Sequence, residues 1–104
     1  MTVLVLARDQ AVIDRIVPLL RDGGIDAKGT IRDEDALACL QAASIGALVI
    51  GGGVEMASRE RLRALAQIGG IAVIEGGARG KDPAHYVREE LLPALRKAAA
   101  EKVD

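Results

Sequence analysis

The sequence predicts an α/β fold of three layers, in which a four-stranded parallel sheet lies between two layers of helices. Short apolar runs alternate with segments of helical apolar spacing, and there are four of each. The first run, residues 2–7, is continuously apolar from Val3, as expected of a strand covered on both faces. Right-handed crossovers place the helices on both faces of the sheet, and the simplest doubly wound strand order is 2-1-3-4. With 104 residues, 50% of them hydrophobic, the whole chain 1–104 is expected to be one domain.

The first half of the chain supplies two strand–helix units. Asp9 is a candidate N-cap for a helix that ends at Gly23 and Gly24. Pro18 lies inside that helix and removes a hydrogen bond, so we expect a kink or a locally opened turn. Residues 25–31 alternate apolar and polar around a glycine and predict a short edge strand. The segment after it begins with acidic residues and predicts a helix. The first helix has an apolar stripe of Val12, Ile13, Ile16, Val17 and Leu20, and the second packs through Leu37 and Leu40.

The second half repeats the pattern. Residues 46–50 predict the third strand and residues 71–75 the fourth, and a helix that begins near residues 56–58 connects them. After a glycine loop, Asp82 and Pro83 form an N-cap and first-turn pair for the last helix. The third helix is expected to pack through Leu62, Leu65 and Ile68, and the last through Val87, Leu91 and Leu95 around an interior Pro93.

Composition excludes several classes of protein. The formal net charge of −1 gives no general attraction to nucleic acid or to an anionic membrane. The single cysteine, Cys39, excludes an internal disulfide and most resembles a small core residue. No apolar run approaches the roughly 20 residues of a membrane span. The start of the chain lacks a basic region and a cleavage site, so we expect a strand there and a cytoplasmic protein.

The candidate site lies where ligands bind in open α/β sheets, beyond the carboxyl ends of the strands at the point where strand order reverses. Arg8 and Asp9 follow the first strand, Gly51, Gly52 and Gly53 follow the third, and Glu75 ends the fourth. The glycines have two interpretations. They form a turn with positive φ and close backbone approach, or the amides of residues 51–54 form a nest that holds an anion or a phosphate.

A second glycine group follows the fourth strand. Gly76, Gly77, Arg79 and Lys81 are either a solvated loop or the rim of a phosphate site. Arg8 and Asp9 are either a ligand-facing pair or a surface arginine beside an N-cap. For Glu75, a salt bridge to Arg8 or Lys81 is favoured over acid–base catalysis.

Residues for catalysis or metal binding are sparse. His85 is the only histidine, and a solvated position in the first turn of the last helix is favoured over a catalytic base. No group of His, Cys and acidic residues has metal-ligand spacing, so neither a metal nor a cofactor is expected. The sequence has no Walker A loop, and no dinucleotide-binding glycine motif follows the first strand.

The stretch "VLVLARDQAVIDRIVPLLRDGGIDAKGTIRDEDALACLQAASIGALVI" resembles a response-regulator receiver domain, the flavodoxin-like phospho-acceptor module of two-component signalling. The likeness lies in the helix lengths, the glycine before the second strand and the "EDAL" start of the second helix, and it covers about residues 2–75. The resemblance implies an Mg²⁺-binding acid pair after the first strand, an acceptor aspartate after the third and a Ser or Thr after the fourth.

This chain departs from the receiver pattern at each of those positions. Only Asp9 remains of the acid pair, with Arg8 at the other position. Gly51 stands at the acceptor position and Glu75 at the Ser/Thr position. Lys81 precedes the last helix as the lysine of the family does, but no fifth strand precedes it. Phosphoryl acceptance needs every one of these roles, so we do not expect it here.

We therefore predict a non-phosphorylatable, receiver-like regulatory or protein-interaction domain. The alternative is a domain that binds a small or phosphate-containing ligand through the glycine loop. An enzyme is the third choice, because no nucleophile, base and oxyanion donors come together.

A homodimer is also predicted, through the fourth strand or the last helix. The fourth strand lacks a fifth strand beside it, and Leu91, Leu92 and Leu95 exceed one narrow stripe. The alternative is a monomer in which the last helix covers that edge.

Overall fold

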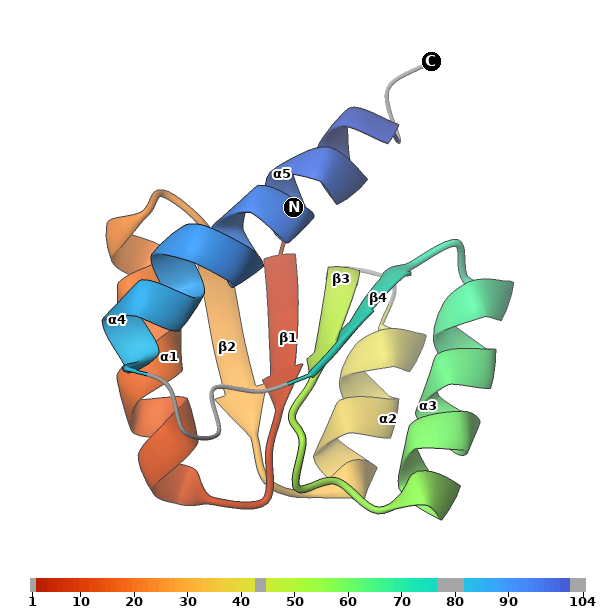
Figure 1. Cartoon of the computed structure of the whole chain (residues 1–104). Helices are drawn as coiled ribbons and strands as arrows, with labels where there is room; N and C mark the ends of the chain where they lie inside the picture. Colours follow the sequence, from red (N-terminus) through yellow and green to blue (C-terminus); the bar gives the residue numbers. More distant parts are fainter. Residues whose placement is uncertain (1, 43–44, 77–81, 102–104) are drawn as a thin grey trace.

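The computed structural model describes residues 2–42, 45–76 and 82–101. Its centre is a four-stranded parallel sheet of order β2-β1-β3-β4, which confirms the predicted topology (Figure 1). Each strand lies within one residue of its predicted position at either end. The strands are β1 (Thr2–Leu6), β2 (Asp26–Thr30), β3 (Ile45–Ile50) and β4 (Ala72–Glu75).

Helices cover both faces of the sheet. One layer contains α1 (Gln10–Asp22) and the C-terminal helical segment, and the other contains α2 (Asp33–Gln41) and α3 (Met56–Ile68) (Figure 1). The C-terminal segment is α4 (Pro83–Tyr86), the π-helix η1 (Val87–Leu91) and α5 (Leu92–Glu101). No helix among the described residues is long and apolar enough to cross a membrane.

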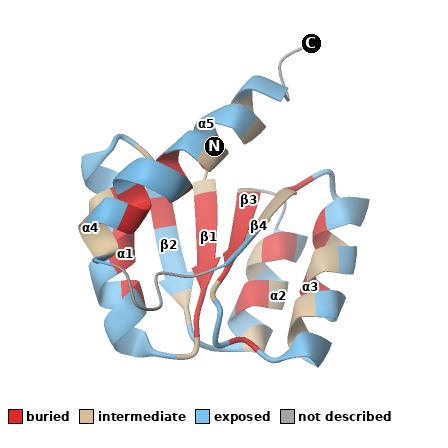
Figure 2. Ribbon diagram, viewed as in Figure 1, coloured by how far each residue is buried: buried red, intermediate tan, exposed pale blue. Residues whose placement is uncertain are grey.

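Each layer encloses an apolar core against one face of the sheet (Figure 2). The two central strands, β1 and β3, contribute buried residues to both cores, as parallel strands covered on both faces do. The largest fully buried side chains are aliphatic: Leu4, Leu6, Leu20, Leu48, Ile50, Leu62, Leu91, Leu95 and Val3.

Helix α1 packs unusually close to β2. A Cβ atom added at Gly29 of β2 would lie 2.5 Å from Cγ2 of Ile13 and 3.1 Å from Cγ2 of Val17. Both are β-branched residues whose rotamers are restricted in a helix. The glycine in the middle of this edge strand therefore lets the helix approach the sheet.

The opened turn that was one expectation at Pro18 does not form, because α1 remains α-helical through that residue. Pro18 and Asp14, whose carbonyl would have accepted the missing hydrogen bond, are both exposed. Water can satisfy that carbonyl, so the helix tolerates the proline.

The locally opened turn occurs instead in the last helix, before Pro93. Here the amide of Leu92 donates to the carbonyl of Val87, five residues back, which closes the π-helix. Pro93 has no amide to donate, and its ring crowds the preceding turn. The wider turn brings both Leu91 and Leu92 into the core, where they are 1% and 9% exposed.

The leucines of the last helix therefore do not form a surplus apolar surface, and that part of the sequence-based expectation is wrong. Leu91, Leu92 and Leu95 are all buried in the α1 layer. Leu92 lies against the end of α1, where a Cβ added at Gly23 would be 3.1 Å from its Cδ1. The segment packs on the α1 side of the sheet (Figure 1).

Two other packing expectations are wrong. Ile68 is 83% exposed, because α3 ends there and the chain reverses through Gly70, at a φ of +70°, to bury Ile71 instead. Val12 is 37% exposed and lies beside the buried stripe of α1.

Candidate functional site

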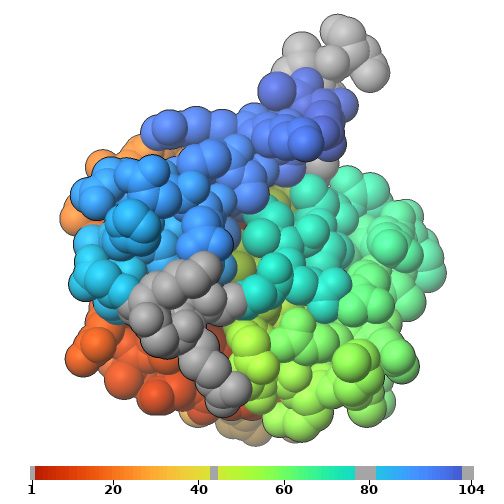
Figure 3. Space-filling view, viewed as in Figure 1, coloured from red at the N-terminus to blue at the C-terminus, as the bar shows by residue number. Residues whose placement is uncertain are grey.

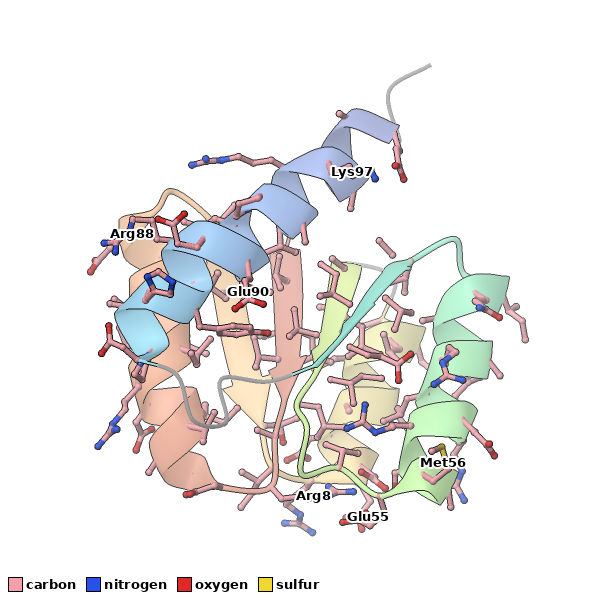
Figure 4. The ribbon with its side chains drawn as sticks, in the orientation of Figure 1. Arg8, Glu55, Met56, Arg88, Glu90 and Lys97 are labelled. Atoms are coloured by element: carbon pink, nitrogen blue, oxygen red, sulfur yellow. The ribbon has the colours of Figure 1, made fainter. Side chains whose placement is uncertain are left out.

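The predicted site residues that the structure describes lie at the carboxyl end of the sheet. Arg8 follows β1, the three glycines follow β3 and Glu75 ends β4. This end of the sheet also carries the first turns of α2 and α3, because each helix follows a strand. Figure 4 shows Arg8 beside Glu55, the residue that precedes α3.

Asp9 is an N-cap. Its Oδ1 accepts a hydrogen bond of 2.9 Å from the amide of Ala11, and its backbone carbonyl accepts from Val12 and Ile13. This confirms the capping interpretation. Within the described residues, Asp9 and Arg8 form no ion pair with each other, because Arg8 turns toward α2 and α3.

Arg8 joins three elements of the fold. Its Nη2 donates to Oδ1 of Asp33 at 2.7 Å, in the first turn of α2, and to Oε2 of Glu55 at 2.8 Å. Its Nε donates to Oε1 of Glu55 at 3.0 Å, and its Nη1 to the carbonyl of Ile31 at 2.9 Å. Ser58 completes the cluster, since its hydroxyl donates to Oδ2 of Asp33 and lies 3.2 Å from Nη2. We call Arg8, Asp33, Glu55 and Ser58 the Arg8 cluster.

The charges of the Arg8 cluster stabilise one another. The hydrogen bond from Ser58, followed by the one from Arg8, lowers the pKa of Asp33 below its ordinary value. The hydrogen bond from Arg8 lowers the pKa of Glu55, and the two carboxylates raise the pKa of Arg8. All three groups are therefore ionised at neutral pH, and none of them is poised to exchange a proton there.

The glycines after β3 do not have the positive φ that the turn interpretation required. Positive φ occurs instead at Gly24, Gly70 and Gly76. Gly51 approaches β1 closely, since its amide donates to the carbonyl of Leu6 at 2.8 Å and a Cβ there would lie 3.3 Å from that oxygen, a tight contact. A Cβ at Gly52 or Gly53 would meet no atom within 4 Å.

The predicted anion nest has lost part of its donor set to bonds within the chain. The amide of Gly51 donates to β1, and the amide of Val54 donates to the carbonyl of Gly51 at 3.2 Å. Only Gly52 and Gly53 of the four residues have an amide without an acceptor in the described part of the chain. An anion would therefore find half of the expected donors.

Arg59 and Glu75 form a second network at this end of the sheet. The guanidinium of Arg59 donates to the carbonyls of Gly51 and Val54, at 2.7 and 3.0 Å, and to Oε1 of Glu75 at 3.2 Å. Arg63 adds two hydrogen bonds to the same carboxylate, at 2.9 and 2.7 Å. These bonds, with that of Arg63 first, lower the pKa of Glu75.

Glu75 therefore pairs with two arginines of α3, and the prediction that it forms a salt bridge with Arg8 is wrong. Lys81, the other expected partner, lies outside the described residues, as do Gly77 and Arg79. Gly76, with a φ of +134°, donates its amide to the carbonyl of Ile50 and so continues the β3–β4 ladder by one residue.

Two of the three arginines of the site, Arg8 and Arg59, are bonded within the chain through every guanidinium nitrogen. Each of the three guanidinium nitrogens of Arg8, and each of those of Arg59, donates to an oxygen of this chain. These bonds leave each of the two side chains fewer N–H groups for a bound phosphate.

The site offers little for metal binding or catalysis. No group of three or more His, Cys, Asp or Glu in the described ranges could hold a metal ion. His85 is exposed in the first turn of α4, which fits the solvated interpretation. Cys39 is half-buried against the α2–α3 core.

Sequence reasoning missed most of the residues that hold this end together, namely Asp33, Glu55, Ser58, Arg59 and Arg63. A signal was present: Asp33 and Glu55 each lie at the start of a helix that follows a strand, and such starts meet at one edge of a parallel sheet. With Arg8 at the end of a central strand, these acids could have been expected to be its partners.

Fold and site together define a Rossmann-like α/β domain in which ion pairs within the chain join the elements at the carboxyl end of the sheet.

Three solved structures have similar folds. A de novo designed Rossmann 2x3 fold protein, solved by NMR, has a TM-score of 0.65 at 14% identity, over 99% of this chain and 92% of the design. A second designed Rossmann fold protein has a TM-score of 0.57 at 11% identity, over 85% of this chain and 93% of the design.

The third is a crystal structure from Burkholderia pseudomallei of a protein described as pilus assembly-related, with a TM-score of 0.61 and 18% identity. That match covers 100% of this chain and 92% of the other. No protein-family model matches this sequence, and no curated protein matches it either. At these identities the likeness shows the fold alone.

Proposed function

We propose that this chain is a non-phosphorylatable, receiver-like domain that acts by binding another protein. The observation that carries the proposal is the position of Arg8. Its guanidinium lies where the receiver resemblance calls for a second Mg²⁺-binding acid, and it is bonded to Asp33 and Glu55. A fixed cation between two carboxylates opposes a divalent cation by charge, and Gly51 offers no acceptor oxygen in its side chain.

The surface of the carboxyl end supports protein binding. Four large hydrophobic residues in the described ranges are exposed: Val12, Ile31, Met56 and Ile68. Three of them lie at this end, since Val12 is in the first turn of α1, Ile31 follows β2 and Met56 begins α3. Exposed apolar side chains at the same end of the sheet as the ion-paired cluster suit a protein partner better than a small anion.

The first experiment tests phosphorylation. The chain is incubated with a small phosphodonor and Mg²⁺, and its intact mass is measured. We expect no mass change and no Mg²⁺-dependent rise in melting temperature. An acid-labile phosphoadduct on Asp9, or on another residue of this end, would refute the proposal.

A pair of variants tests the receiver resemblance itself. Arg8→Asp with Gly51→Asp returns both missing carboxylates, and Arg8→Asn with Gly51→Asn is a control of the same size without the charge. We expect Mg²⁺ to raise the melting temperature of the Asp pair and not that of the Asn pair. Equal responses would contradict a receiver-type pocket with its acids replaced.

The second experiment tests protein binding. Proteins retained by the native chain from its source cells are compared with those retained by Ile31→Ser/Met56→Ser and by the control Ile68→Ser. We expect a partner that the double variant loses and the control keeps. A pattern of retained proteins that is the same for all three chains would contradict binding at the carboxyl end.

A further inference from the structure

The two outer strands of the sheet differ in how their free edges are protected. Strand β2 has the sequence DAKGT, with Asp26 and Lys28 exposed and a glycine between Lys28 and Thr30. Charges and glycine discourage pairing with another strand. Strand β4 has the sequence AVIE, with Ala72, Val73 and Ile74 half-buried and a single charge at its end. Only the β2 edge is protected by its own sequence.

The outward-facing hydrogen-bonding groups of β4 can be assigned from its pairing with β3. The amide of Gly76 donates to the carbonyl of Ile50, and Ile50 lies opposite Glu75. Backbone groups alternate in direction along a strand, so those of Ala72, Ile74 and Gly76 point toward β3. The amides and carbonyls of Val73 and Glu75 consequently point outward, and β4 has no second neighbouring strand in the described part of the chain.

The side chains of β4 also alternate. Ile74 and Ala72 pack against the core that α1 and the C-terminal segment cover, whereas Val73 packs against the α2–α3 core. In a single sheet, residues directly opposite each other lie on the same face. A second β4 strand that pairs antiparallel through a two-fold axis must therefore place each residue opposite one from the same face. This is possible only when the axis passes between two copies of the same residue.

We propose that β4 pairs with β4 of a second copy of this chain, antiparallel and centred on Ile74, to form a continuous eight-stranded sheet. In this register Val73 of each copy lies opposite Glu75 of the other. Each such pair exchanges two main-chain hydrogen bonds, which occupies all the outward amides and carbonyls of Val73 and Glu75 in both copies. Centring on Val73 instead would leave the outward carbonyl of Glu75 unused and would call on the amide of Ile71, which already donates to Ala66 at 2.8 Å.

The centred register also matches the side chains. Ile74 meets Ile74 of the partner in a pair that is not hydrogen-bonded, where side chains come closest. Val73 lies beside the partner's Glu75, whose carboxylate keeps its own bonds to Arg63 and Arg59. No charge is buried without a partner. The contact is isologous, and it closes at two chains because each copy has one such edge.

This assembly stands on the β4 edge alone, so it can fail while the proposed function holds, and the reverse is equally true. The last helix is not part of this contact, because its leucines are buried within the chain. Figure 3 shows the β4 segment, in teal, at the surface between the C-terminal segment and α3.

Disulfide cross-linking tests both the dimer and its register. In a Cys39→Ala background, single cysteines are placed at Ile74, at Val73 and at the exposed control position Ile68, and each chain is oxidised at micromolar concentration. The Cβ atoms of a directly opposed pair lie about 4.5–5.5 Å apart, close to the spacing that a disulfide needs. We expect Ile74→Cys to form covalent dimer at least about tenfold faster than Ile68→Cys.

Different outcomes test the register and the dimer. Fastest cross-linking by Val73→Cys would overturn the register, and equal rates at all three positions, or a native mass of one chain in light scattering, would overturn the dimer. Val73→Pro gives a second test, because it removes an outward amide without touching the β3–β4 ladder. It should keep the melting curve cooperative and raise the dimer dissociation constant about tenfold or more, since two inter-strand hydrogen bonds lose their donors. An unchanged dissociation constant would also overturn the proposal.

Discussion

Replacing Gly29 by alanine should destabilise the fold through one contact. The new Cβ would lie 2.5 Å from Cγ2 of Ile13, and Ile13 is only 6% exposed. That methyl group cannot swing away, because a β-branched side chain in a helix has one preferred rotamer. Either α1 must move from the sheet or Ile13 must leave its rotamer. Overpacking of this kind costs about 1–3 kcal/mol.

An opposing effect reduces the net change. Alanine restricts the unfolded chain more than glycine does, which stabilises the folded state by about 0.4–1 kcal/mol. The expected loss in the free energy of unfolding is therefore about 1–2 kcal/mol. For a chain of this size the melting temperature should fall by about 5–15 °C. Thermal and urea unfolding, followed by circular dichroism, measure both quantities.

Two controls isolate the contact. Gly52→Ala adds the same methyl group where no atom lies within 4 Å, so it should leave the stability unchanged or slightly higher. Ile13→Ala removes the clashing methyl and should partly rescue Gly29→Ala. The double variant should then be more stable, by about 1 kcal/mol or more, than the sum of the single changes predicts. Strict additivity would refute the steric explanation.

Three further predictions follow from the site and the core. Arg8→Gln should lower the free energy of unfolding by about 1 kcal/mol at neutral pH, a value kept small by solvent exposure. Because Arg8 helps to hold the pKa of Asp33 below its ordinary value, that stability is present above about pH 4 and is lost as the pH falls through the lower folded pKa. Native and variant unfolding curves should therefore converge in acid; a constant gap would argue against the ion pair. Leu92→Ala should cost about 2–5 kcal/mol without changing the association state, and a change in association by light scattering would return the last helix to the interface. Millimolar phosphate should raise the melting temperature no more than chloride at equal ionic strength, whereas a larger rise that Gly52→Ala abolishes would favour the ligand-binding alternative.

The topology could be predicted because few arrangements satisfy the sequence. Four apolar strands alternate with four helical segments, and right-handed crossovers leave little choice of strand order. A local feature could also be predicted where one side chain forms it, as with Asp9, the N-cap of α1. The unprotected β4 edge could also be predicted, because the charges and prolines that protect an edge strand are visible in the sequence.

The networks of the carboxyl end could not be predicted as well. Which acid Arg8 reaches depends on how α2 and α3 approach β1 in space, and the sequence separations are 25 and 47 residues. The conformation of the three glycines after β3 could not be predicted for the same reason. Glycine permits positive φ, but the feature found at Gly51 is a close approach to the carbonyl of Leu6, which only the assembled sheet defines. The tolerance of Pro18 depended on which carbonyls face solvent.

The scarcity of aromatic residues has a practical consequence for folding studies. The chain contains one tyrosine and no tryptophan or phenylalanine, and Tyr86 is 7% exposed in α4, at the start of the C-terminal segment. Intrinsic fluorescence therefore reports the docking of that segment and nothing else, while circular dichroism averages over every helix. If the two signals change together on unfolding, the C-terminal segment belongs to the same cooperative unit as the sheet. If fluorescence changes first, the segment undocks as a separate unit, and the core beneath it becomes open to solvent before the rest of the domain unfolds.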